Sequence, residues 1–155
     1  MPIKPLIAVF YRCQDKGEIF MQNNSCDSGN LLKSHSIWRT QLTIALAHHD
    51  ILDAKMIYQK DACRVGKWLH NLKTHQQLCH LQSYLDCLEK HEVFHQEAGK
   101  IADLVNAQEY EAAMEELTES DSDFNRASDE IALAVSNLLY ELDHLGILPE
   151  SKTES

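Results

Sequence analysis

Residues 81–105, LQSYLDCLEKHEVFHQEAGKIADLV, decide the fold class of this 155-residue chain. Apolar residues and two histidines recur there at alternating steps of three and four, at Leu81, Tyr84, Leu88, His91, His95, Ala98, Ala102 and Val105. This spacing places them on one face of a helix, because an α-helix turns once every 3.6 residues. We therefore predict a long helix over about residues 74–106, with this stripe turned toward the core.

Helical periodicity also occurs on both sides of this segment. We predict a first helix over about 31–53 and a fourth over about 107–145, ended by Leu145 and Gly146. A short second helix follows Asp61, a suitable N-cap, so that Cys63 lies in its first turn. The predicted inward positions of the first and fourth helices are His35, Trp38, Leu42, Ala45 and His49, and Ala113, Leu117, Phe124, Ala127, Ile131, Ala134, Leu138 and Leu145. This pattern predicts an all-α protein, an antiparallel four-helix bundle with one short helix that carries Cys63.

The remaining residues and the charge limit the function classes. Residues 1–30 have no clear period and predict an irregular N-terminal segment, 31–146 the helical bundle, and 147–155 a polar tail. The net charge is −10, from 14 Lys and Arg against 24 Asp and Glu, so a nucleic-acid partner is not expected. No apolar run approaches the roughly 20 residues of a membrane span or resembles a signal peptide. We therefore expect a cytoplasmic protein that does not bind membranes.

Two histidines lie in the predicted core. His91 and His95 are one helical turn apart on the inward stripe, and burying two imidazoles costs free energy unless each finds a partner. His35 occupies the inward stripe of the first helix, so a bundle can bring it opposite this pair. A shared metal ion satisfies all three rings; hydrogen bonds to backbone or hydroxyl groups are the alternative.

Cys63 supplies a fourth candidate ligand. A thiol at a helix N-terminus faces the positive end of the helix dipole, which favours the thiolate that binds metals. Three imidazoles and one thiolate form a set that suits tetrahedral zinc. We expect Gly66 to let the short helix approach its neighbours closely, and Trp68 to pack beside the site and exclude water.

The order of these residues resembles the chemoreceptor zinc-binding domain family over about residues 31–145. The resembling elements are His35 near a Trp, the Cys-x-x-Gly-x-Trp pattern from Cys63 to Trp68, and His-x-x-x-His from His91 to His95. The resemblance implies a helical bundle with zinc bound by His35, Cys63, His91 and His95. That family occurs at the ends of bacterial chemoreceptors and cyclic-di-GMP synthases, where it reports zinc or oxidation of the zinc-bound cysteine, and it often dimerises.

From this resemblance we expect a zinc or oxidant sensor rather than an enzyme, since four protein ligands leave no open position for a reacting water. Nothing in the chain resembles a chemoreceptor signalling hairpin or a cyclase domain. We therefore expect the output to act in trans, on a chemoreceptor or a cyclic-di-GMP enzyme, and the protein to form a homodimer.

Three alternatives stay open at this stage. Cys87, four residues before His91, lies in a helical row with the two histidines and can replace Cys63, although the stripe places Leu88 inside instead. Glu92 to His95 and Glu141 to His144 are both Glu-x-x-His, a pattern found in di-iron carboxylate oxidases of the four-helix class. A metal-free interaction module is the third, with a binding face formed by the acidic run Glu109, Glu111, Glu115, Glu116, Glu119, Asp121 and Asp123.

Overall fold

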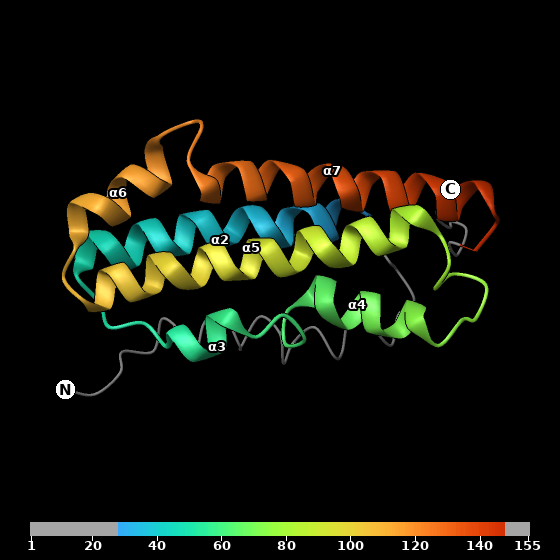
Figure 1. Ribbon diagram of the computed structural model, residues 1–155, viewed down its shortest axis with the longest axis horizontal. Helices are drawn as coiled ribbons and strands as arrows, with labels where there is room; N and C mark the ends of the chain where they lie inside the picture. Colours follow the sequence, from blue (N-terminus) through green and yellow to red (C-terminus); the bar gives the residue numbers. More distant parts are fainter. Residues whose placement is uncertain (1–27, 148–155) are drawn as a thin grey trace, which may run out of the picture.

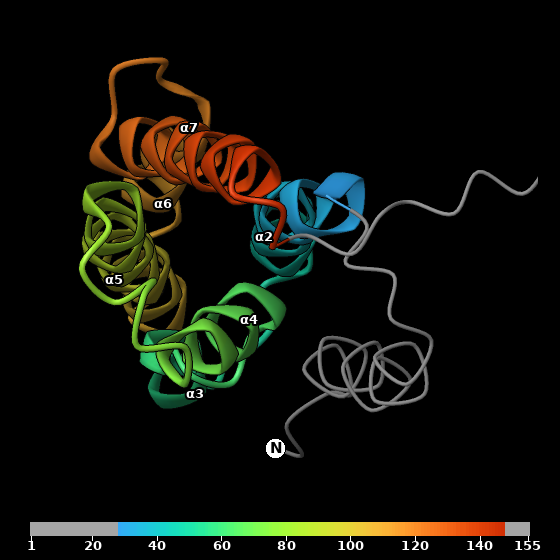
Figure 2. The same ribbon diagram turned by 90° about the vertical axis from the view of Figure 1, so that its right-hand side faces the viewer.

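The computed structural model describes residues 28–147, which form helices and connecting turns without strands. The helices are α2 (Ser28–His48), α3 (Ala54–Tyr58), α4 (Arg64–Lys73), α5 (Gln82–Asn106), α6 (Tyr110–Thr118) and α7 (Asp123–His144). The long helices α2, α5 and α7 form three sides of a bundle, and the consecutive short helices α3 and α4 form the fourth (Figure 2). Because α2 and α5 run against α4 and α7, the bundle is antiparallel, as predicted (Figure 1).

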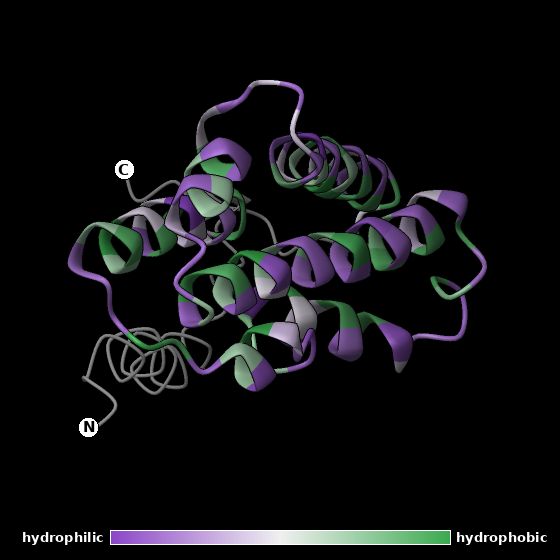
Figure 3. Cartoon of the chain, turned by 60° about the vertical axis from the view of Figure 1, so that its left-hand side comes forward, coloured by the Kyte–Doolittle hydropathy of each residue, from purple (hydrophilic) through white to green (hydrophobic). Residues whose placement is uncertain are grey.

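Each long helix buries one face. Hydrophobic and hydrophilic residues alternate along these helices, as the period requires (Figure 3). The predicted inward residues of α2 and α7 are buried, except His49 and Leu145, which lie just beyond the helix ends and are exposed. α5 is central to the packing, because it contacts α3, α4, α6 and α7.

The inward face of α5 differs from the prediction at one position that concerns the site. Leu88 is 37% exposed, whereas Cys87 is fully buried. The buried face is centred on the heptad row Tyr84, Cys87, His91, Phe94, Ala98, Ile101 and Val105. Both Cys87 and Leu88 lie at helical spacing from Tyr84, so the spacing does not decide which of the two is buried.

Three predicted helix boundaries are wrong. The first helix ends at His48 rather than near residue 53, the third begins at Gln82 rather than near 74, and the fourth is divided into α6 and α7. α2 and α5 each end with a residue of positive φ, His49 at 53° and Gln108 at 64°. In both cases the N–H of this residue and the N–H of the next one donate back to carbonyls of the last turn, as in a Schellman motif. Since neither residue is glycine, the sequence carried no clear stop signal.

The short helices have their own N-terminal caps. Asp53 accepts a hydrogen bond from the Met56 N–H at 3.1 Å and starts α3, which the sequence analysis did not predict. Ser122 accepts from the Asn125 N–H at 3.1 Å and starts α7. At the far end of α7, Gly146 has a φ of 68°, so the predicted stop after Leu145 is confirmed.

The predicted segment 1–30 lies outside the described residues apart from 28–30, with which α2 begins, and so does the tail 147–155 apart from Ile147. None of the described helices is both long and apolar enough to cross a membrane.

Candidate metal centre

The bundle brings the four predicted site residues together in its interior. His35 comes from α2, Cys63 from the start of α4, and His91 and His95 from α5. Each of the four side chains is at most 5% exposed. One donor atom from each residue lies within 4.8 Å of the other three, and among residues 28–147 this is the one group found with such an arrangement of His, Cys, Asp or Glu. These four buried residues can therefore hold a metal ion.

Cys63 is placed by the turn that joins α3 to α4. It is itself the N-cap of α4, in place of the predicted Asp61, and its Sγ accepts from the Gly66 N–H at 3.3 Å. Gly66 lacks a side chain for a steric reason, because a Cβ there would lie 1.9 Å from the Lys60 carbonyl oxygen. The close approach expected of Gly66 is thus confirmed, and it lets the first turn of α4 carry the thiol into the core.

The two histidines of α5 direct nitrogens at this sulfur. His91 Nε2 lies 2.9 Å and His95 Nε2 3.4 Å from Cys63 Sγ. On its other side, His95 Nδ1 lies 2.7 Å from the Ile57 carbonyl oxygen, which can only accept, so Nδ1 carries the hydrogen. This tautomer leaves the lone pair on Nε2, and a backbone carbonyl on the outer nitrogen is a common arrangement for metal-bound histidines.

His35 has a buried nitrogen without a partner. Its Nε2 makes no hydrogen bond in the structure, although buried polar atoms are almost always paired. The His35 ring packs edge-on against Phe94, with centroids 4.6 Å apart, and against His91 at 5.3 Å. Trp38 packs against His95 at 5.3 Å. Trp38 and Phe94 thus surround the imidazoles with apolar rings, while Trp68, which the sequence analysis placed here, is buried on α4.

Burial fixes the protonation of the cluster. Desolvation, aided by the neighbouring imidazoles, lowers the pKa of His35 to about 3 and that of His91 to about 2, and desolvation also lowers the pKa of His95. All three rings are therefore neutral near pH 7, which is the form that binds metals. Burial raises the pKa of the Cys63 thiol to about 11, against the smaller opposite effect of nearby backbone N–H groups. The N–H groups at the helix N-terminus favour the thiolate, as expected, but burial outweighs them, and a bound cation would stabilise the thiolate.

The donor set fits a tetrahedral metal. In a tetrahedral zinc site, bonds of about 2.3 Å to sulfur and 2.0–2.1 Å to nitrogen put the donors about 3.3–3.6 Å apart. The distance of 3.4 Å from Cys63 Sγ to His95 Nε2 lies in that range, whereas the 2.9 Å to His91 Nε2 is shorter. A metal ion would also give the unpaired Nε2 of His35 a partner. The neutral imidazoles and the unpaired nitrogen suit a metal ion, which this cluster can hold.

The alternative ligands lie elsewhere. Cys87 is buried, but the cluster contains Cys63 and not Cys87. Neither Glu92 nor Glu141 belongs to a metal-ligand group among residues 28–147, and His144 is exposed, so the described residues form no di-iron site. His48, His70 and His75 are exposed. Cys13 and Cys26 lie outside the described residues.

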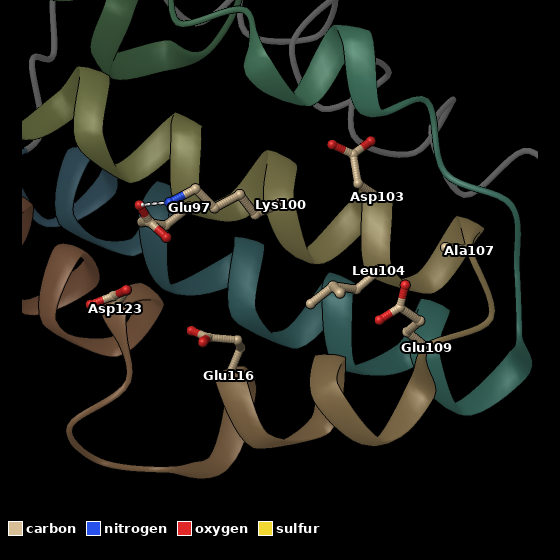
Figure 4. Close-up of a pocket in the computed structure, with 8 residues that line it drawn as sticks. All are labelled: Glu97, Lys100, Asp103, Leu104, Ala107, Glu109, Glu116 and Asp123. Atoms are coloured by element: carbon tan, nitrogen blue, oxygen red, sulfur yellow. Dashed lines mark hydrogen bonds and ion pairs between the residues drawn. The ribbon is translucent and has the colours of Figure 1, made fainter.

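Two surface hollows adjoin α5. One, of about 480 Å³, is lined by residues 58–61, Glu92 and Gln96, beside the turn that precedes Cys63. The other, of about 430 Å³, lies between α5, α6 and the start of α7 (Figure 4). Its lining carries five carboxylates and Lys100, which pairs with Glu97 at 2.6 Å. This second hollow includes part of the predicted acidic run, whose members are exposed except for the half-buried Glu116.

No protein-family model, curated protein or solved structure matches this chain. The resemblance to the chemoreceptor zinc-binding domains therefore rests on the motif residues themselves. The structure shows an all-helical domain with a buried cluster of three histidines and one cysteine, and this cluster can hold a metal ion.

Proposed function

We propose that this protein binds one zinc ion through His35, Cys63, His91 and His95, and that it is a zinc or oxidant sensor in bacterial signal transduction. The observation that carries the proposal is the convergence of four buried donor atoms within 4.8 Å. Zinc is the metal favoured by one thiolate and three imidazoles in a closed tetrahedral set. When bound, zinc would supply structural cross-linking of helices rather than activation of a water molecule, since all four positions come from the protein.

The ligands come from three sides of the bundle. Binding would tie α2, the turn before α4, and α5 to one point, because each contributes at least one donor. Cys63 is the one donor that the turn before α4 contributes, just as His35 is the one donor of α2. Loss of the Cys63 bond would therefore release the start of α4 while the two histidines of α5 stay on a continuous helix.

Oxidation offers a second way to release Cys63. A peroxide that transfers one oxygen atom to the Cys63 thiolate gives a sulfenic acid and hydroxide, and the product is a poorer metal ligand. Both signals act on the same sulfur, so the proposal covers zinc and oxidant sensing by one site. The output partner in this proposal is a chemoreceptor or a cyclic-di-GMP enzyme, and a homodimer is the proposed assembly.

Native mass spectrometry of the full chain, purified without chelator, tests the proposal. We expect one zinc ion per wild-type chain, and its loss in His91→Ala. His75→Ala is the matched control, because His75 is exposed and lies outside the cluster. Two irons per chain, or no metal after gentle purification, would contradict the proposal.

The oxidant response is tested separately. We expect peroxide to release zinc from the wild type, followed with a zinc-responsive dye. Cys79→Ser is the control, because Cys79 lies outside the cluster and is partly exposed. Equal rates of zinc release from the wild type and Cys79→Ser would exclude Cys79 as the reacting thiol and so support Cys63. A peroxide response that is abolished in Cys79→Ser would contradict the assignment to Cys63.

A further inference from the structure

The segment that leads to Cys63, residues 52–60, packs along one row of residues on α5. This segment lies along α5 in the opposite direction, as α3 does in Figure 1. At the end of the segment farther from Cys63, the Asn106 side chain accepts a hydrogen bond from the Leu52 N–H and donates one to the Leu52 carbonyl, both at 2.8 Å. At the proximal end, Lys60 pairs with Glu92 at 2.8 Å. The α5 residues involved are Glu92, His95, Gly99, Asp103 and Asn106, which follow one another by three or four and so form one helical row.

Tyr58 makes the contact in the middle of this row. Its hydroxyl donates to Asp103 Oδ2 at 2.7 Å, and its ring lies directly on Gly99. A Cβ built on Gly99 would lie 2.4–2.5 Å from three carbons of that ring. The absence of a side chain at position 99 is therefore what lets the Tyr58 ring lie this close to the helix.

This contact is adjacent to a contact of the metal centre. The residue before Tyr58 is Ile57, whose carbonyl oxygen lies 2.7 Å from His95 Nδ1. α3 is a helix of only five residues, too short to hold its own conformation in water, so side-chain contacts must fix its place. The Tyr58 side chain is the one next in sequence to the carbonyl that orients His95.

We propose that Tyr58, seated on Gly99 and bonded to Asp103, is a positioning residue for the metal centre, because it holds the Ile57 carbonyl against His95 Nδ1 and so keeps Nε2 directed at the metal. This inference rests on the proposed zinc binding. It concerns a side chain that is 39% exposed and donates no atom to the cluster. Loss of outer contacts to metal-bound histidines elsewhere weakens metal binding or activity about 10–100-fold, which sets the effect expected here.

The test measures zinc release from the zinc-loaded full chain into excess chelator. We expect Tyr58→Ala and Gly99→Ala to release zinc about 10–100-fold faster than wild type, because both abolish the close contact of the Tyr58 ring with position 99. Tyr58→Phe keeps the ring and loses the hydroxyl, so its rate of zinc release should lie between the rate of the wild type and that of Tyr58→Ala. Tyr140→Ala is the matched control, since Tyr140 is 68% exposed on α7 and lies outside this row.

Two further measurements separate positioning from general stability. Gly99→Ala improves the helix propensity of α5, so a purely local helix effect predicts slower zinc release, the opposite sign. In the metal-free protein, nitrogen NMR of His95 should show hydrogen on Nδ1 in wild type and a mixture of tautomers in Tyr58→Ala. In the Tyr58→Ala background, Gly99→Ala should cause no additional acceleration, because its methyl group acts through the missing ring.

The outcomes distinguish the two proposals. A wild-type chain that binds no zinc overturns the proposed function and this inference with it. A wild-type chain that binds zinc, with release unchanged in both Tyr58→Ala and Gly99→Ala, overturns the positioning role alone. Additive effects in the double variant would also overturn it. If Tyr58→Ala does not fold, Tyr58→Phe and Gly99→Ala decide the question by the same rates.

Discussion

Replacing His35 with leucine should stabilise the metal-free protein and abolish the stabilising effect of zinc. His35 is 5% exposed and its Nε2 has no hydrogen-bond partner. A buried polar group without a partner costs about 1–3 kcal/mol, and leucine removes it at similar volume. Leucine also loses the edge-on contact with the Phe94 ring, an aromatic pair worth about 0.5–1.5 kcal/mol. The net gain in the free energy of unfolding is about 1 kcal/mol without metal.

Zinc reverses this order. At a free zinc concentration 100 times the dissociation constant, the metal adds about 2.7 kcal/mol to the free energy of unfolding of the wild type. The variant, with one ligand removed, gains little at the same zinc concentration. The wild type is therefore more stable than His35→Leu in zinc and less stable in chelator, and this crossing distinguishes a metal ligand from an ordinary core residue.

The assay is urea denaturation under reducing conditions, in chelator and in buffered zinc. His75→Leu is the control, because this exposed residue should change stability by no more than about 0.5 kcal/mol in either condition. Thermal unfolding checks the result, since 1 kcal/mol shifts the midpoint of a chain of this size by about 2–4 °C. A His35→Leu variant that is less stable than wild type in chelator, and that keeps the full zinc effect, would refute the reasoning.

Three other perturbations test the same site. The pKa values of His35 and His91 in the folded state, about 3 and about 2, lie below the unfolded value, so the unfolded chain takes up protons first as pH falls. In chelator, the free energy of unfolding should therefore drop by about 1.4 kcal/mol per pH unit for each histidine below about pH 6.5. Urea denaturation between pH 7 and 5 measures this, and a flat profile would contradict their burial as neutral rings. Cys63→Ser should weaken zinc binding by more than the roughly 10–100-fold typical of outer contacts, whereas Cys87→Ser should lower stability and keep zinc affinity, and competition titrations showing the reverse would make Cys87 the ligand. Gly66→Ala should lower the free energy of unfolding by about 1–3 kcal/mol or more, because the added methyl group would lie 1.9 Å from a backbone carbonyl oxygen. An unchanged urea midpoint would show that the turn before α4 can move aside.

The helical class followed from spacing alone, whereas the full set of four residues also rested on the resemblance to the chemoreceptor zinc-binding domains. His91 and His95 are one turn apart on a face that is otherwise apolar, and this relation holds wherever the helix begins. His35 and Cys63 were predicted from an inward position and a helix start, both local properties of the sequence. The structure then brings all four donors within 4.8 Å, although they lie on three separate elements.

The helix boundaries and the choice between neighbouring faces did not follow from the sequence. His49 and Gln108 follow helix ends in a conformation usually taken by glycine, so neither residue marks the helix end in the sequence. Burial of Cys87 instead of Leu88 depends on how α5 is rotated in the bundle, because both residues lie at helical spacing from Tyr84. The contact between Tyr58 and Gly99 joins residues 41 positions apart in the sequence, and no periodic pattern predicts that contact.

Zinc K-edge X-ray absorption of the zinc-loaded full chain tests the central claim most directly, because it counts the donor atoms around the metal. We predict one sulfur at about 2.3 Å and three imidazole nitrogens at about 2.0–2.1 Å. Cys63→Ser should lose the sulfur shell, and Cys87→Ser should retain it. A wild-type spectrum with no sulfur, or with two, would contradict a centre made by His35, Cys63, His91 and His95.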